Sequence, residues 1–279
     1  MPTCDCRVCE PAREEGDPHA RLGNSTFVHE ANAVVDAPES LWAMLNREGV
    51  MDVDYVFVTH HHADHVGGLR VVQAIGRPDY PIADWENADP ATVVMSETTY
   101  DRLSESLDIE AEYDDRGYAE FEFLNDGETM RLDGGVEVTG IGAPLDPDGP
   151  ADAAMGYLFE KSESQGDDGS VLVFPDETTF LDLTKVPDDL DLWVKECGMF
   201  RKTPDGDPIL TDELWAEERD HQTTFDQTVE QIWAVKPDRT VLTEIEEIYR
   251  RRPGEYAELE REYEDLNLQF GHDGMHLEV

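Results

Sequence analysis

Basic residues are scarce in this chain of 279 residues. Lysine and arginine together number 21 against 65 aspartates and glutamates, which gives a formal charge of −44. Proteins bind nucleic acid largely through basic groups on its phosphates, so a nucleic-acid partner is disfavoured, although molar salt weakens that argument. The acidic residues are spread through the whole sequence. They therefore indicate an acidic surface rather than one binding segment.

A surface this acidic repels itself and loosens a compact chain in dilute buffer. Salt screens the repulsion, over a Debye length that falls to about 3 Å at 1 M. The composition accordingly predicts a halophilic protein that works in concentrated salt.

Long apolar runs are also missing. No segment approaches the roughly 18 apolar residues that span a bilayer, and Met1-Pro2-Thr3-Cys4 does not open a signal peptide. We expect no membrane partner and a cytoplasmic location. In such a reducing compartment, the four cysteines indicate a metal site more readily than disulfides.

Strand-like and helix-like apolar patterns alternate along the chain. Strands are predicted at residues 25–29, 33–35, 55–59, 91–95, 155–160, 170–174, 190–194, 240–243 and 275–279. Helices are predicted at residues 41–48, 97–107, 223–235 and 254–267. The alternating stretch 119–141, with its Gly-containing turns, predicts an antiparallel meander. With no repeat and no long linker, we expect one α/β domain over residues 1–279.

One segment concentrates metal-binding side chains. Residues 59–68 read Thr-His-His-His-Ala-Asp-His-Val-Gly-Gly, directly after the apolar run Val56-Phe57-Val58. Neutral imidazoles and a carboxylate suit Zn and neighbouring divalent ions. If the apolar run is a strand, His60 and His62 leave its end on one side of a loop, and Asp64 and His65 on the other. The spacing predicts a metal centre that could serve two ions; the alternative is a His-rich loop that binds metal only weakly.

The pattern His-x-His-x-Asp-His after a core strand resembles the signature of the metallo-β-lactamase superfamily. The resemblance implies a four-layer αβ/βα sandwich with metals at one edge. It also implies that Asp176, after the apolar run 171–174, bridges two metals.

Two positions depart from the family pattern. No histidine occurs between Ala143 and Pro150, where the family places its third-loop ligand, so Asp146 or Asp148 substitutes or the ligand is absent. Glu244 stands where the last metal histidine is expected. A carboxylate there can still bind Zn, and it shifts the preference toward harder ions such as Mn.

The N-terminal Cys4-x-Cys6-x-x-Cys9 can wrap one structural Zn if a fourth ligand is supplied, which makes residues 1–10 a predicted zinc-binding segment. This cluster ahead of the histidine loop resembles the phosphoribosyl cyclic phosphodiesterases of phosphonate breakdown. Those relatives place a histidine where this chain has Glu247; Cys197 or a nearby histidine is the alternative fourth ligand. The same resemblance implies that His221 contacts the substrate phosphate.

These features together predict a metal-dependent hydrolase, a phosphodiesterase acting on a small cyclic phosphate ester. One or two Zn or Mn ions are expected, with Asp64 and His221 as the catalytic residues. The predicted ligands are His60, His62, Asp64, His65, Asp176, Glu244 and Asp146. A homodimer is compatible with the sequence. The alternatives are a hydrolase of another ester or of RNA, and a non-catalytic metal-binding accessory protein of cofactor biosynthesis, which the missing histidines favour.

Overall fold

The computed structural model of the chain describes residues 3–75, 89–161, 169–175 and 178–279. The chain forms two compact units, each assembled from separated segments. Unit 1 contains residues 1–22, 145–147 and 169–279, and unit 2 contains residues 23–144 and 148–168. The single domain expected over residues 1–279 stays a prediction. None of the described helices is long and apolar enough to cross a membrane.

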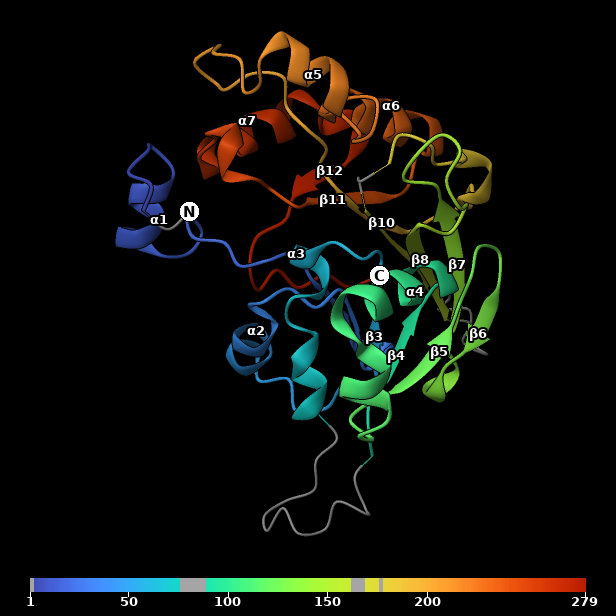
Figure 1. The fold of residues 1–279 in the computed structure, drawn as a ribbon. Coiled ribbons are helices and arrows are strands. Elements are labelled where there is room, and N and C mark those ends of the chain that lie inside the picture. The colour runs from blue at the N-terminus through green and yellow to red at the C-terminus, as the bar shows by residue number, and fades with distance from the viewer. Residues whose placement is uncertain (1–2, 76–88, 162–168, 176–177) are drawn as a thin grey trace. The chain divides into compact units, whose positions relative to one another are not determined.

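Unit 2 contains a five-stranded sheet with the strand order β1-β2-β3-β4-β5 (Figure 1). β1 runs antiparallel to β2, and the other neighbouring pairs are parallel. The register places Val34, Val56 and Val93 side by side, and all three are buried. Such β-branched residues suit a parallel sheet that is covered on both faces. The strands are β1 (Thr26–Val28), β2 (Ala33–Val35), β3 (Tyr55–Phe57), β4 (Thr92–Met95) and β5 (Glu120–Phe123).

Helices pack on this sheet through buried leucines. Leu41 of α2 and Leu103 of α4 join the cluster that contains the strand valines, and Leu69 joins it from the turn after α3. The helices at 41–48 and 97–107 confirm the sequence prediction. The helical elements of unit 2 are η1 (His29–Ala31), α2 (Leu41–Glu48), α3 (Ala63–Val66), η2 (Leu69–Gln73), α4 (Glu97–Leu107), the π-helical η4 (Glu110–Asp114) and η5 (Asp133–Gly135).

Three more strands of unit 2 pair antiparallel in the order β6-β7-β8. They are β6 (Thr129–Arg131), β7 (Glu137–Ala143) and β8 (Ala154–Lys161). The predicted meander over 119–141 is therefore wrong in its first part, because β5 pairs parallel with β4. Alternation of apolar and polar residues indicates an extended segment and does not identify its partner.

Unit 1 contains four parallel strands in the order β9-β10-β11-β12. They are β9 (Gly169–Phe174), β10 (Leu192–Glu196), β11 (Arg239–Thr243) and β12 (Leu268–Phe270). The predicted strand at 275–279 is wrong, since the last strand is β12 and residues 275–279 form none. Asn267, with a φ of 46°, ends the helical turn η8, and β12 begins at the next residue. The predicted helix 254–267 therefore extended too close to this strand for the strand to be predicted.

The helical elements of unit 1 surround a second apolar cluster that includes Phe225, Leu242 and Phe270. A capping box at Thr224 begins α6, as the side chain of Thr224 accepts from the backbone of Gln227. The elements are α1 (Cys9–Glu15), η6 (Leu183–Lys185), α5 (Asp212–Glu218), α6 (Phe225–Val235), η7 (Glu247–Tyr249), α7 (Pro253–Glu262) and η8 (Glu264–Leu266).

The N-terminal segment is attached to α7 within unit 1. The guanidinium of Arg7 pairs with Glu255 at 2.8 Å, and its carbonyl accepts from Arg252 Nε at 3.0 Å. These contacts hold the cysteine segment against the start of a helix that lies late in the sequence.

Candidate metal centre

The histidine loop of unit 2 continues a hydrogen-bonded strand. After β3, the N–H of Val58 donates to the carbonyl of Val94 at 2.9 Å. The carbonyl of Thr59 accepts from Met155 N at 2.8 Å, and the Tyr157 hydroxyl donates to the carbonyl of Val58 at 2.6 Å. The loop therefore starts from a backbone fixed on several sides, and His60 follows fully buried.

Asp36, which directly follows β2, binds the histidine loop through its carboxylate. Its carboxylate accepts from the N–H of Thr59 at 2.8 Å and from the Thr59 hydroxyl at 2.9 Å. The same carboxylate lies 2.8 Å from Nδ1 of His65. Asp36 is itself buried, so these bonds supply the polar partners that a buried carboxylate needs.

The network determines the tautomers of two histidines. A carboxylate only accepts, so the Thr59 hydroxyl donates its single proton to Asp36. The oxygen of that hydroxyl then accepts from Nδ1–H of His60, 3.0 Å away, while Nδ1–H of His65 donates to Asp36. Both neutral rings consequently carry a lone pair on Nε2, the nitrogen with which a metal could be bound.

The imidazoles of His60, His62 and His65 lie close together. The ring centroid of His60 lies 4.1 Å from that of His65 and 4.6 Å from that of His62. Burial, reinforced by the neighbouring imidazoles, lowers the pKa of His60 well below its usual value. Nε2 of His60 is buried without a hydrogen-bond partner among the described residues, and a bound cation would satisfy it. The donor set thus fits a divalent metal.

Asp64 and His65 enter the cluster from α3. The carboxylate of Asp64 lies 3.8 Å from Nε2 of His65, and its side chain is 60% exposed. The backbone of α3 is tied to the residue after Asp36, because Ala37 N donates to the carbonyl of His65 and Gly68 N donates to the carbonyl of Ala37, each at 2.7 Å. His60, His62, Asp64 and His65 therefore lie together, and their role as ligands stays a prediction. The predicted division of the loop into two sides is not seen, because the ring of His60 lies closer to that of His65 than to that of His62.

The remaining predicted ligands lie elsewhere. Asp176 lies outside the described residues. Glu244 follows β11 in unit 1 with a φ of 50°, and its carbonyl accepts from the thiol of Cys197 at 3.5 Å. Asp146 and His221 meet within the same unit, with Oδ1 and Nδ1 3.6 Å apart. The roles of all four residues stay predictions.

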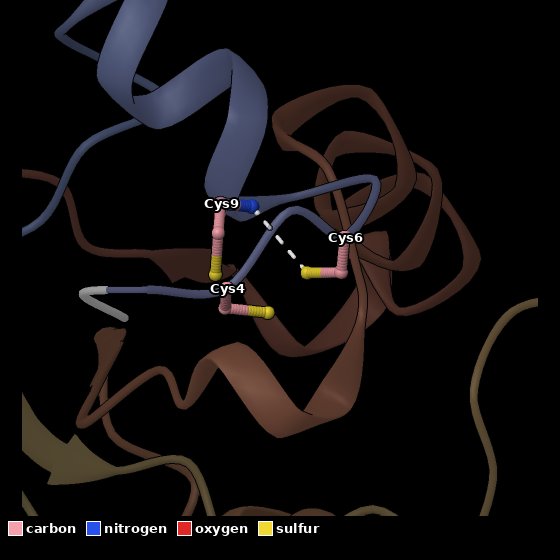
Figure 2. Close-up of side chains that lie close together, drawn as sticks. All are labelled: Cys4, Cys6 and Cys9. Atoms are coloured by element: carbon pink, nitrogen blue, oxygen red, sulfur yellow. Dashed lines mark hydrogen bonds between the residues drawn. The ribbon is translucent and has the colours of Figure 1, made fainter.

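The three N-terminal cysteines converge in unit 1, as Figure 2 shows. All three sulfur atoms lie within 4.8 Å of one another. Regular tetrahedral coordination with Zn–S bonds of about 2.3 Å needs sulfur atoms about 3.8 Å apart, so a small adjustment would suffice. The guanidinium of Arg250, just beyond η7, lies 3.7 Å from Sγ of Cys4. Glu247 begins that short helix, three positions earlier.

The cysteine environment favours a thiolate at one position. Burial opposes ionisation of Cys6, but hydrogen bonds from the N–H groups of Cys9 and Val8 and contact with the Cys4 thiol lower its pKa to about 6. Burial raises the pKa of Cys9. The contact with Cys4 raises the pKa of Arg250, which keeps a positive charge beside the cluster.

Residues 31–245 match the family described as the beta-lactamase superfamily domain, which is more than half of the chain. The chain belongs to the metallo-β-lactamase superfamily. This match and the mixed α/β architecture confirm the predicted fold class. A search of curated proteins gives no match.

Solved structures show the metallo-β-lactamase fold over almost the whole chain. A diphosphatase from the PhnP family aligns with a TM-score of 0.69 and 21% identity, covering 99% of this chain and 91% of its own. Zn²⁺-bound PqqB from Methylobacterium extorquens gives 0.68 and 15%, with coverages of 99% and 94%. The short form of human tRNase Z gives 0.53 and 13%, with 93% of both chains. At these sequence identities the comparisons show a shared fold and nothing further.

Sequence reasoning missed Asp36 and Thr59 as supporting residues of this metallo-β-lactamase loop. A signal existed for Asp36, since a polar residue directly after an apolar strand lies at the carboxyl end of the sheet, where loops from neighbouring parallel strands meet. Using that signal requires knowing that β2 and β3 are parallel neighbours. Thr59 carried no signal beyond its place before His60.

Proposed function

We propose that the protein is a metal-dependent phosphodiesterase that acts on a small cyclic or otherwise strained phosphate ester. The observation that carries the proposal is the pair of buried histidines, His60 and His65, whose Nε2 lone pairs are set by Thr59 and Asp36. Two fold neighbours, the PhnP-family diphosphatase and tRNase Z, bear names that denote hydrolysis of phosphorus–oxygen bonds, which supports a phosphate compound as the substrate.

The histidine loop supplies the proposed ligands. His60 and His62 would hold one Zn or Mn ion, and Asp64 and His65 a second, with Asp176 and Glu244 as further proposed ligands. When bound, such ions would supply Lewis-acid activation of water, lowering its pKa toward about 7. Asp36 and Thr59 hold the imidazoles in the required tautomers, so their nitrogens need no proton loss before binding.

His221 is the proposed substrate contact in unit 1. The carboxylate of Asp146 lies 3.6 Å from Nδ1 of His221 and leaves Nε2 for a ligand. From there His221 would bind a phosphoryl oxygen or donate a proton to the leaving oxygen.

Two substitutions test the mechanism with metal-replete protein in molar salt. Asp64→Asn removes an anionic ligand and should abolish hydrolysis of cyclic and bis-aryl phosphodiesters. His221→Ala should lower kcat by roughly 10²- to 10⁴-fold, the usual contribution of a general acid, while the metal content stays unchanged. His272→Ala, which alters an exposed histidine late in the sequence, serves as the control and should retain full activity.

A non-catalytic metal-binding role is the second candidate. It is favoured by Glu244 in place of the expected histidine and by the PqqB structure, which covers this chain as fully as the diphosphatase does. A wild-type protein that holds its metal but turns over no phosphodiester would establish this candidate over the first.

The cysteine cluster is the proposed structural zinc site, with Cys4, Cys6 and Cys9 as ligands and Glu247 as the fourth. Zinc there should survive mild chelation that removes the metal at the histidine loop, because a closed thiolate site exchanges slowly. Cys6→Ser should abolish this retained zinc and Glu247→Gln should weaken its retention, as measured by elemental analysis. Glu258→Gln, exposed on α7, is the matched control. Full retention in Glu247→Gln would remove Glu247 from the ligand set.

A further inference from the structure

Arg102, on α4 of unit 2, touches the histidine loop between two proposed ligands. Its Nη1 lies 3.3 Å from Nε2 of His61. A guanidinium only donates hydrogen bonds, so this nitrogen of His61 is the acceptor. The permanent charge of Arg102 is thereby positioned by the loop that would bind metal.

His61 lies between Arg102 and the ligand cluster. The chain bends at His61 instead of continuing as a strand. The ring centroid of His61 lies 4.9 Å from that of His62 and 6.5 Å from that of His60. Arg102 is consequently separated from the proposed reacting centre by the side chain of His61.

The charge of Arg102 is not neutralised within the described part of the chain. Three other arginines of unit 2 pair with carboxylates, namely Arg47 with Glu48, Arg116 with Glu112 and Arg131 with Glu137, while Arg70 bonds to the amide of Gln73. Arg102 instead bonds to a neutral imidazole and makes no ion pair with a described carboxylate. In a chain with a formal charge of −44, such a cation at a surface cleft is available to an anion.

The cleft beside Arg102 is shallow and widely open to solvent, and it is lined by His61, Arg102, Glu105 and Ser106, all from unit 2. Ser106 is anchored to the helix, because its hydroxyl donates to the carbonyl of Arg102 at 3.0 Å. Glu105 is exposed and contributes a negative charge to the rim. An anion that binds here must therefore be attracted by Arg102 more strongly than it is repelled by Glu105.

We propose that Arg102 is a specificity-determining residue that binds an anionic group of the substrate other than the reacting phosphoryl group. The inference rests on the proposed function for the identity of the reaction, whereas the anion contact itself rests on the cleft. Binding energy from such a remote group acts on substrate selection, so it separates esters with and without a second anion.

The first test compares adenosine 2′,3′-cyclic phosphate with and without a 5′-phosphate, using metal-replete protein in constant molar KCl. Wild-type kcat/KM should favour the 5′-phosphorylated ester by roughly 10-fold or more, the size of a charge-assisted hydrogen bond. Arg102→Gln should remove the preference by raising KM for that ester. Arg102→Lys should retain part of the preference, because lysine keeps the positive charge but lacks the planar set of donors of the guanidinium. Arg116→Gln, which alters a paired surface arginine, should keep the wild-type ratio.

The second test needs no turnover. Adenosine 5′-monophosphate should raise the melting temperature of the wild-type protein more than adenosine does, and Arg102→Gln should erase that difference. Glu105→Gln should enlarge it. If this pattern holds while neither cyclic ester is hydrolysed, the proposed function fails and the anion site stands. The inference is overturned if Arg102→Gln keeps the full preference or lowers both reactions equally. It is also overturned if adenosine 5′-monophosphate and adenosine stabilise the wild-type protein alike.

Discussion

Asp36 connects two proposed metal ligands through one carboxylate. It accepts directly from His65, and it reaches His60 through the Thr59 hydroxyl. Each histidine is thereby held in one tautomer and one orientation before any metal binds. The arrangement reduces the loss of side-chain freedom on binding, which is the usual role of a carboxylate behind a ligating histidine.

Asp36→Asn should weaken metal binding at the histidine loop by roughly 10- to 100-fold. The amide keeps the size of the side chain, but it has one acceptor oxygen where the carboxylate serves both Thr59 and His65. Competition against a chelator measures the affinity, and circular dichroism checks the fold. Asp101→Asn, on the exposed face of α4, should bind as the wild type does. Equal affinity in both variants would show that Asp36 has no supporting role.

At this scale the sequence predicted the residues that are adjacent in the chain and missed those brought in by the fold. His60, His62, Asp64 and His65 lie within six positions, and the structure gathers them as expected. Asp36 lies 29 positions before His65, and only the parallel pairing of β2 with β3 brings them together. A spacing rule has no access to such a contact.

The short helix α3 depends on a glycine at its end. A Cβ at Gly68 would overlap the carbonyl oxygen of Pro38, next to the segment that carries Asp36. That close approach also allows the 2.7 Å hydrogen bond from Gly68 N to the carbonyl of Ala37. Glycine is needed here for space, because its φ is not in the left-handed region.

Gly68→Ala should lower the free energy of unfolding by about 1–3 kcal/mol, the usual cost of overpacking, and should also weaken metal binding at His65. Denaturant titration measures the first effect and chelator competition the second. Gly254→Ala is the matched control, because a Cβ there meets no atom within 4 Å and the residue lies in α7. It should be neutral or stabilising. A Gly68→Ala protein as stable as wild type would contradict the close packing.

Helices and buried strands were predicted well, since their apolar spacing is local. α2 and α4 have the predicted bounds, and β3 delivers the histidine loop. The failures concern pairing and short elements. β5 reads as part of a meander but pairs with β4, and β12 has only three residues directly after a helical turn. Partners come from tertiary packing, and a three-residue strand is too short to show a period.

For the whole molecule, the dominant quantity is the formal charge of −44. Most ion pairs of the described residues lie at the surface, and such exposed pairs contribute little stability individually. They cannot offset the repulsion among the remaining carboxylates, which acts over the Debye length. The predicted adaptation to salt therefore rests on the excess charge.

Lowering KCl below about 0.5 M should reduce the melting temperature progressively, because the repulsion is then less screened. Calorimetry from 3 M to 0.1 M KCl measures the effect, with sucrose at matched osmolality as the control for a nonionic cosolute. A melting temperature that stays constant over this range would contradict halophilic adaptation.

The attachment of the cysteine segment has a consequence for biosynthesis. Cys4 meets Arg250 and Arg7 meets Glu255, contacts that span 246 and 248 residues of sequence. The cysteine segment therefore cannot reach its final position until residues 250–255 have been made. During that interval its three thiols are available to solution zinc, to oxidants and to other nascent chains. A nascent chain arrested before residue 247 should accordingly expose Cys4, Cys6 and Cys9 to alkylation, and the released full-length protein should protect them.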